Sequence, residues 1–415
     1  MEKYSENLLK IVGCIAYFSL SFHKIRLQFS PSFYIIYNSL CKIFRIGRYD
    51  YGRIIFWNSF SDYNMGRIPR SRNWRVVDGC PAGLSLSSSD IQVFLNRRKP
   101  GQTSYSTMRK EADEVEILSG VFEGHTTGVP ISMLVRNQDQ RSHDYTQIKS
   151  CYRPGHADYT FDAKYGCRDY RGGGRSSGRE TIGRVAGGAI ASLLLKSLGI
   201  HVQAYTKAIG PYTIPEEEYD FSVLTKDPLC MPHLGYSEKA QAYLNTCMKQ
   251  KDSAGGIIEC QITGLPAGIG EPVFDKLDAL LAQAVLSVGA VKGFEIGDGF
   301  AAAKAKGTEN NDAFCIQNGQ LAKQTNHSGG TLGGMSDGST VCFRAAIKPT
   351  PSISSVQHTV NTFMEEVELS VKGRHDPIIV PRAVVVIESM AALTVADLLL
   401  RNMSATMDNL RRIYQ

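Results

Sequence analysis

The pattern of apolar residues along this 415-residue chain predicts an α+β fold, layered β-α-β, in a single large domain. Strand-like and helix-like segments interleave without the regular strand–helix–strand period of a doubly wound sheet. Neither glycine-rich run, at 172–174 or at 329–338, stands between a strand and a helix as a GxGxxG motif, which argues against a dinucleotide-binding fold. With 43% hydrophobic and 21% charged residues, the composition is that of a chain with a substantial core.

Four segments have strand-like patterns. Residues 115–120 and 129–135 alternate or run apolar around a Gly-His-Thr-Thr-Gly turn, which predicts a β-hairpin. Residues 257–262 and 340–347 predict two further strands.

Three segments have helical patterns. Residues 179–198 place seven apolar side chains at helical spacing, and Gly199 closes the pattern. Residues 277–288 predict a second helix. Residues 384–401 predict a strand that runs into an amphipathic helix.

The charge balance indicates a small anionic ligand rather than a nucleic acid. The net charge of +6 is modest, and arginines gather around one segment instead of forming a basic track. The ten cysteines stand singly without CxxC pairs, so we expect reduced packing residues of a cytoplasmic protein and no bound metal. No stretch of about twenty apolar residues occurs, so we expect no membrane span.

The segment 153–177 (RPGHADYTFDAKYGCRDYRGGGRSS) is typical of an anion-binding site. Arginine forks match carboxylate and phosphate oxygens, and glycines let backbone N–H groups approach an anion closely. His156 can move a proton beside the anion. The segment leads into the N-terminus of a predicted helix, which favours negative charge. A solvated basic loop is the alternative, but such a loop does not need a triple glycine and several tyrosines.

Several motifs resemble a known family. VVDGCPAGL, RPGHADYT, KYG-RDYRGGGRSS-RET and KGRHDP resemble chorismate synthase, the last enzyme of the shikimate pathway, colinearly from about Val76 to about Asn402. The resemblance implies a β-α-β sandwich with internal pseudo-symmetry in a homotetramer. No strong sequence repeat indicates this symmetry independently.

The resemblance implies a lyase that makes chorismate from 5-enolpyruvylshikimate 3-phosphate by 1,4-elimination of phosphate, with reduced FMN and no net redox change. The substrate carries a phosphate and two carboxylates, so several arginines must neutralise it as it leaves water. Arg98, Arg153 and Arg184 match family positions for this role. Ser104 stands where the family often has a further arginine. For Arg98 a solvated face is the alternative.

Two residues match catalytic positions of the family. His156 would protonate or hydrogen-bond the flavin as charge develops on it, and a structural histidine is the alternative. Asp376, in GRHDP, matches an aspartate that assists proton removal at flavin N5. For His375 beside it, a packing or hydrogen-bonding role is the alternative to a part in catalysis.

The resemblance also implies positions for FMN, where amides and hydroxyls would cradle the flavin phosphate and ring edge. Plain glycine turns and proline-fixed loops explain some of them almost as well, and Gly289 replaces an asparagine common in the family. NADPH is expected only indirectly, through an intrinsic or external flavin reductase. The FMN positions are Arg175, Ser176, Ser177, Gly289, Ala290, Gly333, Lys348, Pro349, Thr350, Pro351, Ser352 and Arg374.

The first 75 residues differ in composition from the rest. They hold sixteen of the 38 aromatic residues but only four of the 39 glycines. The apolar run 11–22 resembles a signal-peptide core, but the acidic residues before it and the lack of a small-residue cleavage site do not fit. We expect 1–55 to be a spurious or non-conserved extension and 76–415 to form the catalytic domain.

Residues 56–75 are predicted to be frameshifted. Just before VVDGCPAG the family carries FG-x-LFR-x-TT-(F/W)-GESHG, which contains a catalytic histidine, but this chain reads FWNSFSDYNMGRIPR at 56–70. A compatible set of codons, read one base later, translates as FGTLFRITTWGESHG. Part of this reading does not depend on the choice of codons, because Met65 followed by Gly66 must yield Trp when read one base later.

Two alternatives to a working lyase follow. A chain without the GESHG histidine would be an inactive remnant that binds ligand without eliminating phosphate, or that does not fold. A flavin oxidoreductase with NADPH activity of its own has little support in the sequence.

Overall fold

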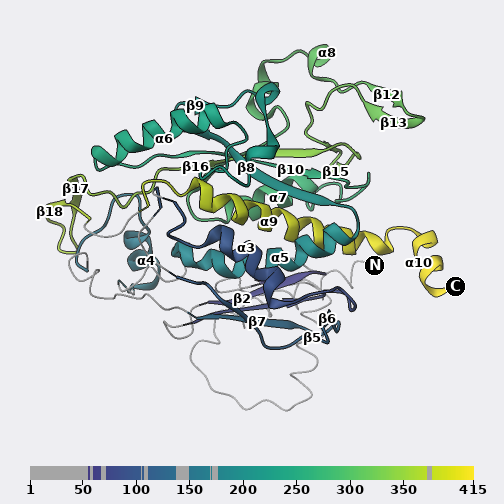
Figure 1. The fold of residues 1–415 in the computed structure, drawn as a ribbon, viewed down its shortest axis with the longest axis horizontal. Coiled ribbons are helices and arrows are strands. Elements are labelled where there is room, and N and C mark those ends of the chain that lie inside the picture. Colours follow the sequence, from purple (N-terminus) through teal and green to yellow (C-terminus); the bar gives the residue numbers. More distant parts are fainter. Residues whose placement is uncertain are drawn as a thin grey trace, which may run out of the picture. The chain divides into compact units, whose positions relative to one another are not determined.

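The described residues form two five-stranded antiparallel sheets with a layer of long helices between them (Figure 1). The computed structural model describes residues 55–56, 59–66, 72–103, 105–106, 111–136, 149–168, 170, 176–371 and 376–415. The chain divides into two compact units, Met1–Arg53 and Ile54–Gln415, and every described residue belongs to the second. The extension predicted at 1–55 therefore lies outside the described residues, except for Ile55.

The first sheet has the strand order β1-β2-β3-β7-β4. Its strands β4 and β7 pair antiparallel with Val115 opposite Val135, which confirms the predicted hairpin. A small second hairpin, β5 (Val121–Phe122) with β6 (His125–Thr126), is inserted at its turn. The strands of the sheet are β1 (Ile55–Phe56), β2 (Ser61–Gly66), β3 (Arg72–Asp78), β4 (Val115–Ile117) and β7 (Ile131–Arg136).

The second sheet has the order β11-β16-β10-β8-β9 and contains the two strands predicted at 257–262 and 340–347. Its strands are β8 (His201–Ile209), β9 (Tyr212–Thr213), β10 (Gly256–Thr263), β11 (Val291–Ile296) and β16 (Val341–Ile347). Three more two-stranded ribbons are β12 (Phe314–Gln317) with β13 (Gln320–Lys323), β14 (Thr331–Leu332) with β15 (Met335–Ser336), and β17 (Gln357–Val360) with β18 (Glu366–Leu369).

Four helices form the middle layer, and two of them confirm the helices predicted at 179–198 and 277–288. These are α3 (Ser88–Arg98), α5 (Thr181–Ser197), α7 (Leu277–Leu286) and α9 (Val380–Arg401). The other helices are α4 (Asp158–Tyr165), α6 (Leu234–Lys249), α8 (Gly307–Asn310), α10 (Met407–Tyr414) and the 3-10 turns η3 (Gly178–Glu180), η4 (Glu216–Glu218), η5 (Phe221–Val223), η6 (Gly299–Lys304) and η7 (Asn402–Ser404).

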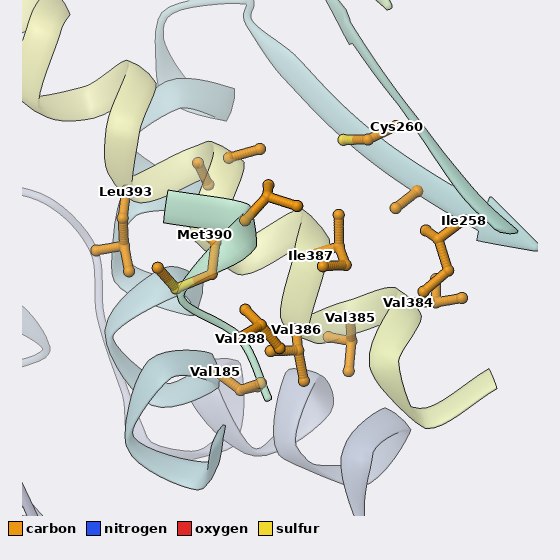
Figure 2. Packing of buried hydrophobic residues seen from close by; sticks show 14 of the residues in the cluster. Val185, Ile258, Cys260, Val288, Val384, Val385, Val386, Ile387, Met390 and Leu393 are labelled. Atoms are coloured by element: carbon orange, nitrogen blue, oxygen red, sulfur yellow. The ribbon is translucent and has the colours of Figure 1, made fainter. Parts of the chain in front are cut away.

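Helix α9 shows that the strand predicted at the start of 384–401 was wrong, because α9 is one continuous helix. Pro381 stands in its first turn, where a missing N–H costs no hydrogen bond. The consecutive residues 384–387 are each at most 2% exposed, among side chains of α5 and β10 (Figure 2). A helix buried on all sides loses its amphipathic period, so a β-branched run in it resembles a strand. By length and composition Val380–Ser404 could also cross a membrane, but 83% of its apolar window is buried inside the protein, as in a core helix.

An internal repeat relates the two halves, which confirms the expected pseudo-symmetry. The order β2-β3-β7-β4 in one sheet matches β8-β10-β16-β11 in the other. In each half the second strand leads into Gly-x-Pro-Ala-Gly, at 79–83 and 264–268, and then into a helix.

The same hydrogen bonds stabilise both halves. The Thr126 hydroxyl accepts a hydrogen bond from the backbone N–H of Leu84 at 3.0 Å. The Ser336 hydroxyl accepts one from the N–H of Ile269 at 2.9 Å. Each hydroxyl also donates to the proline carbonyl of its own motif, at 2.6 Å in both cases. The short Gly-x-Pro-Ala-Gly motif is thus the sequence signal of the repeat, too short to stand out without the structure.

The repeat reveals polar residues at core positions of β2 and β3. Aligned on the two Gly-x-Pro-Ala-Gly motifs, Asn73 and Arg75 correspond to the apolar Ile258 and Cys260. Asp62 of β2 lies opposite Val77 of β3. In the second half, Ile262 corresponds to Val77 and lies opposite Val202 of β8, so Val202 is the counterpart of Asp62.

Asp62 and Arg75 form a buried ion pair, 1% and 5% exposed, against glycines of α5. Within the described residues, Asp62 Oδ1, Arg75 Nε and Nη1, and Asn73 Nδ2 find no hydrogen-bond partner. Burial raises the pKa of Asp62 although the Arg75 charge opposes the shift. The charges at these positions therefore oppose folding of the first sheet.

Candidate active site

Arginines and carboxylates gather where α5 begins. Arg98, at the end of α3, is 3% exposed and donates from Nε to Thr181 Oγ1 and from Nη2 to the Gly178 carbonyl, both at 2.9 Å. Its Nη1 lies 2.8 Å from Asp113 Oδ2. Burial lowers the pKa of Arg98 to about 10, helped by the nearby Arg382 charge, so the guanidinium stays charged at neutral pH. Arg98 is therefore not the solvated residue considered as its alternative.

Asp113 joins this arginine to a second one. Its other oxygen lies 3.4 Å from Arg179, which also pairs with the buried Glu111. Asp113 has φ 48°, a left-handed conformation that residues other than glycine rarely adopt. Such strain is typical of positions held in place by their surroundings, here by two guanidinium groups.

Asp376, the first described residue after a gap in the GRHDP segment, lies beside the same group. Arg382 of α9 contacts Asp376 Oδ2 through Nη1 at 2.7 Å. The same guanidinium donates from Nε to the backbone carbonyl of Arg98 at 3.1 Å. The structure therefore brings the predicted Asp376 and Arg98 into one cluster through a residue that sequence reasoning missed.

Arg184 connects α5 to the loop after α7. Its Nη1 donates to Ser287 Oγ at 2.6 Å, two residues before Gly289. Among the described residues other than its chain neighbours, no atom lies within 4 Å of the place that a Cβ at Gly289 would occupy, so the described residues leave the loop open there. The predicted substrate arginine and the predicted flavin loop are therefore neighbours.

A second group of predicted residues meets around His156. His156 Nε2 lies 2.8 Å from Ser352 Oγ, and Lys348 Nζ donates to the Gly155 carbonyl at 2.8 Å. The backbone N–H of Lys348 donates to the Ala290 carbonyl at 3.0 Å. Three segments distant in the sequence therefore form one surface.

Residues 253–254 link the two groups. Ser253 Oγ donates to the Thr350 carbonyl at 2.7 Å, and the N–H of Ala254 donates to the Pro377 carbonyl at 2.9 Å. Because Pro377 follows Asp376 directly, the aspartate and the 348–352 segment flank the same backbone.

Arg153 forms an ion pair within its own segment. Its Nε and Nη2 contact the two oxygens of Asp158 at 2.7 and 2.8 Å, a bidentate pair at the start of α4. Burial opposes ionisation of Asp158, but the bonds and charges of Arg153 and Arg168 outweigh it and lower its pKa. Arg153 thus orders the loop that carries His156. In Figure 1, α4 and the β17–β18 hairpin lie near each other at the left, consistent with the Tyr152 N–H donating to the Val360 carbonyl at 3.0 Å.

Three further predicted FMN positions, Ser176, Ser177 and Gly333, lie in the described part of the chain. Ser177 caps η3 by accepting from the N–H of Arg179, and Ser176 before it is exposed. Gly333 lies in the β14–β15 turn, where the next residue's carbonyl accepts from the N–H of Leu277 at the start of α7. Gly289 follows the other end of this ten-residue helix, which is about 15 Å long at 1.5 Å per residue. Arg175, Arg374, His375 and Ser104 lie outside the described residues.

Several residues of the site carry weak sequence signals. Arg382, Asp113 and Glu111 stand in none of the quoted motifs, and only the tertiary contacts assign them to the cluster, whereas Arg179 belongs to the RET of the RDYRGGGRSS-RET motif. For Arg382, one signal was available: it stands six residues after Asp376, in the first turn of a helix.

Arginines, a helix start and a histidine that meet within a pseudo-symmetric β-α-β sandwich are typical of an enzyme active site. A family model described as chorismate synthase matches residues 71–400. The chorismate synthase of Lachnoclostridium phytofermentans is 68% identical over 341 residues, 82% of this chain and 93% of that protein. The chorismate synthase of Methanocella arvoryzae is 53% identical over 348 residues, again 82% and 93%. A solved structure described as "Crystal Structure of Chorismate Synthase" has a TM-score of 0.67 at 27% identity, covering 86% of this chain and 97% of that one.

The chain therefore belongs to the chorismate synthase family. As a member of this family the chain is a lyase of aromatic amino acid biosynthesis, and the reaction of the family forms chorismate.

Proposed function

We propose that this chain is an FMN-dependent lyase that eliminates phosphate from 5-enolpyruvylshikimate 3-phosphate. The observation that carries the proposal is the meeting of His156, Lys348 and Ala290 beside the arginine cluster at the start of α5. These segments are far apart in the sequence, and their joint surface combines cationic groups with a proton carrier.

The arginines supply the charge that a trianionic substrate requires. Arg98 and Arg184 frame the first turn of α5, where the helix dipole adds positive potential. Because Arg98 is buried and anchored, its charge would act mainly by its field and by holding the helix start. Arg153 would contribute through the order of the 153–158 loop.

The residues present fit a flavin. Within the described residues, the buried hydroxyl of Thr350 has no hydrogen-bond partner, which suits a donor or acceptor awaiting a ligand. The open loop at Gly289 and the ammonium of Lys348 lie next to the same segment. Reduced FMN, when bound, supplies an electron-rich ring that assists departure of the phosphate.

His156 and Asp376 are the proton-handling groups of the proposal. The Ser352 contact orients the His156 ring, and Arg382 holds one oxygen of the Asp376 carboxylate. We further propose a cytoplasmic homotetramer, with NADPH needed only to reduce the flavin, through an intrinsic or external reductase. Nucleic acid and membrane partners are not part of the proposal.

The direct test is chorismate formation by the purified chain with reduced FMN and the enolpyruvyl substrate under anaerobic conditions. The same assay is run on a chain in which residues 56–70 carry FGTLFRITTWGESHG. Product from either chain supports the proposal, and no product from the second chain contradicts it. NADPH oxidation by the purified protein without added reductase, with no chorismate formed by either chain, would favour the oxidoreductase alternative.

One observation favours the inactive remnant for the sequence as it stands. The buried Asp62 and Arg75 and the half-buried Asn73 replace apolar residues of the repeat, and the reading shifted by one base puts isoleucine at position 62. The same reading puts the GESHG histidine at position 69, outside the described residues. We therefore propose that residues 56–75 stand in a shifted frame, and that the chain as written lacks the acid for the leaving phosphate.

A DNA read across the codons for residues 52–79 separates the two cases. An uninterrupted frame for GESHG makes this an intact enzyme. The printed frame makes it a mutated gene, and full activity from the chain as written would eliminate the remnant.

A further inference from the structure

We propose that Arg382 is a positioning residue for Asp376, and that it couples this carboxylate to the arginine cluster at the start of α5. The inference rests on the function proposed above. It is carried by the two contacts of a single guanidinium, which joins α9, the 376–377 segment and the end of α3.

The geometry of Arg382 is suited to orientation. Nη1 contacts Asp376 Oδ2 at 2.7 Å, while Nε donates to the Arg98 carbonyl at 3.1 Å. The planar guanidinium keeps these two donors at a fixed angle, so the carboxylate position becomes tied to the backbone of α3. The side chains of Arg382 and Asp376 are 22% and 15% exposed, which leaves the pair partly accessible to a ligand.

A comparison with Arg184 supports this role. Arg382 is the third residue of α9, and Arg184 is the fourth residue of α5. Each guanidinium reaches from the start of a core helix to a neighbouring segment of the site, Arg184 to Ser287 and Arg382 to Asp376. Both contacts therefore connect the first turn of a core helix to a segment of the site.

The charge arrangement explains what would follow from loss of Arg382. Asp376 also lies in the field of Arg98, whose charge is partly balanced by Asp113. Without Arg382 the Asp376 carboxylate would turn toward the remaining guanidinium. A displacement of about 1 Å in a group that handles a proton costs as much as a hundredfold in rate.

The test is a double-mutant cycle in the full-length chain in which residues 56–70 carry FGTLFRITTWGESHG, with Arg382→Gln, Asp376→Asn and both changes together. Arg401→Gln is the matched control, because Arg401 stands at the other end of α9 and pairs with Asp275 at 2.9 Å. Two readouts are taken for every variant: kcat and KM with reduced FMN, and the dissociation constant of oxidised FMN with substrate present, followed by flavin fluorescence. The second readout does not require turnover.

We expect Arg382→Gln to lower kcat about 10- to 100-fold with KM changed less than about threefold. In the Asp376→Asn background, Arg382→Gln should have almost no further effect on either readout. Arg382→Lys, which keeps one contact, should recover part of the loss.

Independent effects of the two changes, or an Arg382→Gln variant equal to the parent on both readouts, would overturn the inference. If Asp376→Asn alone leaves both readouts unchanged, the role proposed for Asp376 fails instead, and the inference falls with it. A thermal unfolding midpoint lowered equally in Arg382→Gln and Arg401→Gln would identify the shared stability cost of losing an α9 ion pair.

Discussion

His156 and Ser352 are 196 positions apart in the sequence, yet the histidine Nε2 lies 2.8 Å from the serine hydroxyl oxygen. The contact joins the 153–158 loop to the 348–352 segment, and Lys348 makes a second link to Gly155. A histidine held at one ring nitrogen has a defined ring orientation, which proton transfer requires.

Replacing Ser352 with alanine should reduce catalysis more than flavin binding. The His156 ring would lose its hydrogen bond to Ser352, and we expect kcat to fall about tenfold. Steady-state kinetics and flavin titration check this in the chain in which residues 56–70 carry FGTLFRITTWGESHG. Ser355→Ala is the matched control, because that hydroxyl donates to the exposed carbonyls of Gln250 and Lys251 and not, within the described residues, to His156. Equal activity of Ser352→Ala and the control would show that the contact does not serve His156.

Removing the buried charge pair in the first sheet should stabilise the chain. Replacing Asp62 and Arg75 together by valine gives both positions the apolar character found at their counterparts in the repeat. We expect the free energy of unfolding to rise by about 1–4 kcal/mol, whereas either single change should lower it by about 3–5 kcal/mol. Urea denaturation measures all three variants. A double variant less stable than the parent would contradict the proposed foreign origin of these residues.

The repeated hydroxyls of Thr126 and Ser336 should contribute equally to stability. Each is nearly buried and accepts a hydrogen bond from a backbone N–H that would lose its partner. Thr126→Val and Ser336→Ala should each cost about 1–3 kcal/mol, and the costs should add. Thr246→Val, on the exposed face of α6, is the control and should change stability by less than about 0.5 kcal/mol. Strongly unequal costs in denaturant unfolding would show that the two halves are not energetically equivalent.

Acid should weaken the contribution of Asp158. Its folded-state pKa is lowered, so the stability it contributes is fully present above its unfolded-state pKa of about 3.9 and is lost as the pH falls through the folded-state value. The difference in unfolding free energy between the parent and Asp158→Asn should therefore be constant near neutral pH and shrink below about pH 4. Asp408→Asn, in an exposed pair with Arg411 on α10, should show a much smaller difference. A difference that is independent of pH would exclude this ionic contribution.

Segments with a clear period could be predicted from the sequence. The pattern at 179–198 became α5, and the strands at 257–262 and 340–347 became β10 and β16. The start of α9 could not be predicted, because burial on both sides removes the polar face that identifies a helix. The repeat was missed because its signal is only a five-residue motif, while its strand order appears only once the sheets have formed.

The sequence predicted some residues of the candidate site and gave no indication of the contacts of others. Motifs around His156 and Asp376, together with VVDGCPAGL and RDYRGGGRSS, identified the family and its reaction before any contact was known. These motifs did not indicate that Arg98 is buried, nor that Arg382 holds Asp376.

Residue identity and local period, which are properties of short stretches of chain, therefore determined the family, the single domain and most of the strands and helices. The tertiary structure decided which charges neutralise one another, because an ion pair depends on distances between side chains that sequence separation does not set. It also decided that Asp62 and Arg75 form a buried ion pair, since only the fold determines which charges are removed from water.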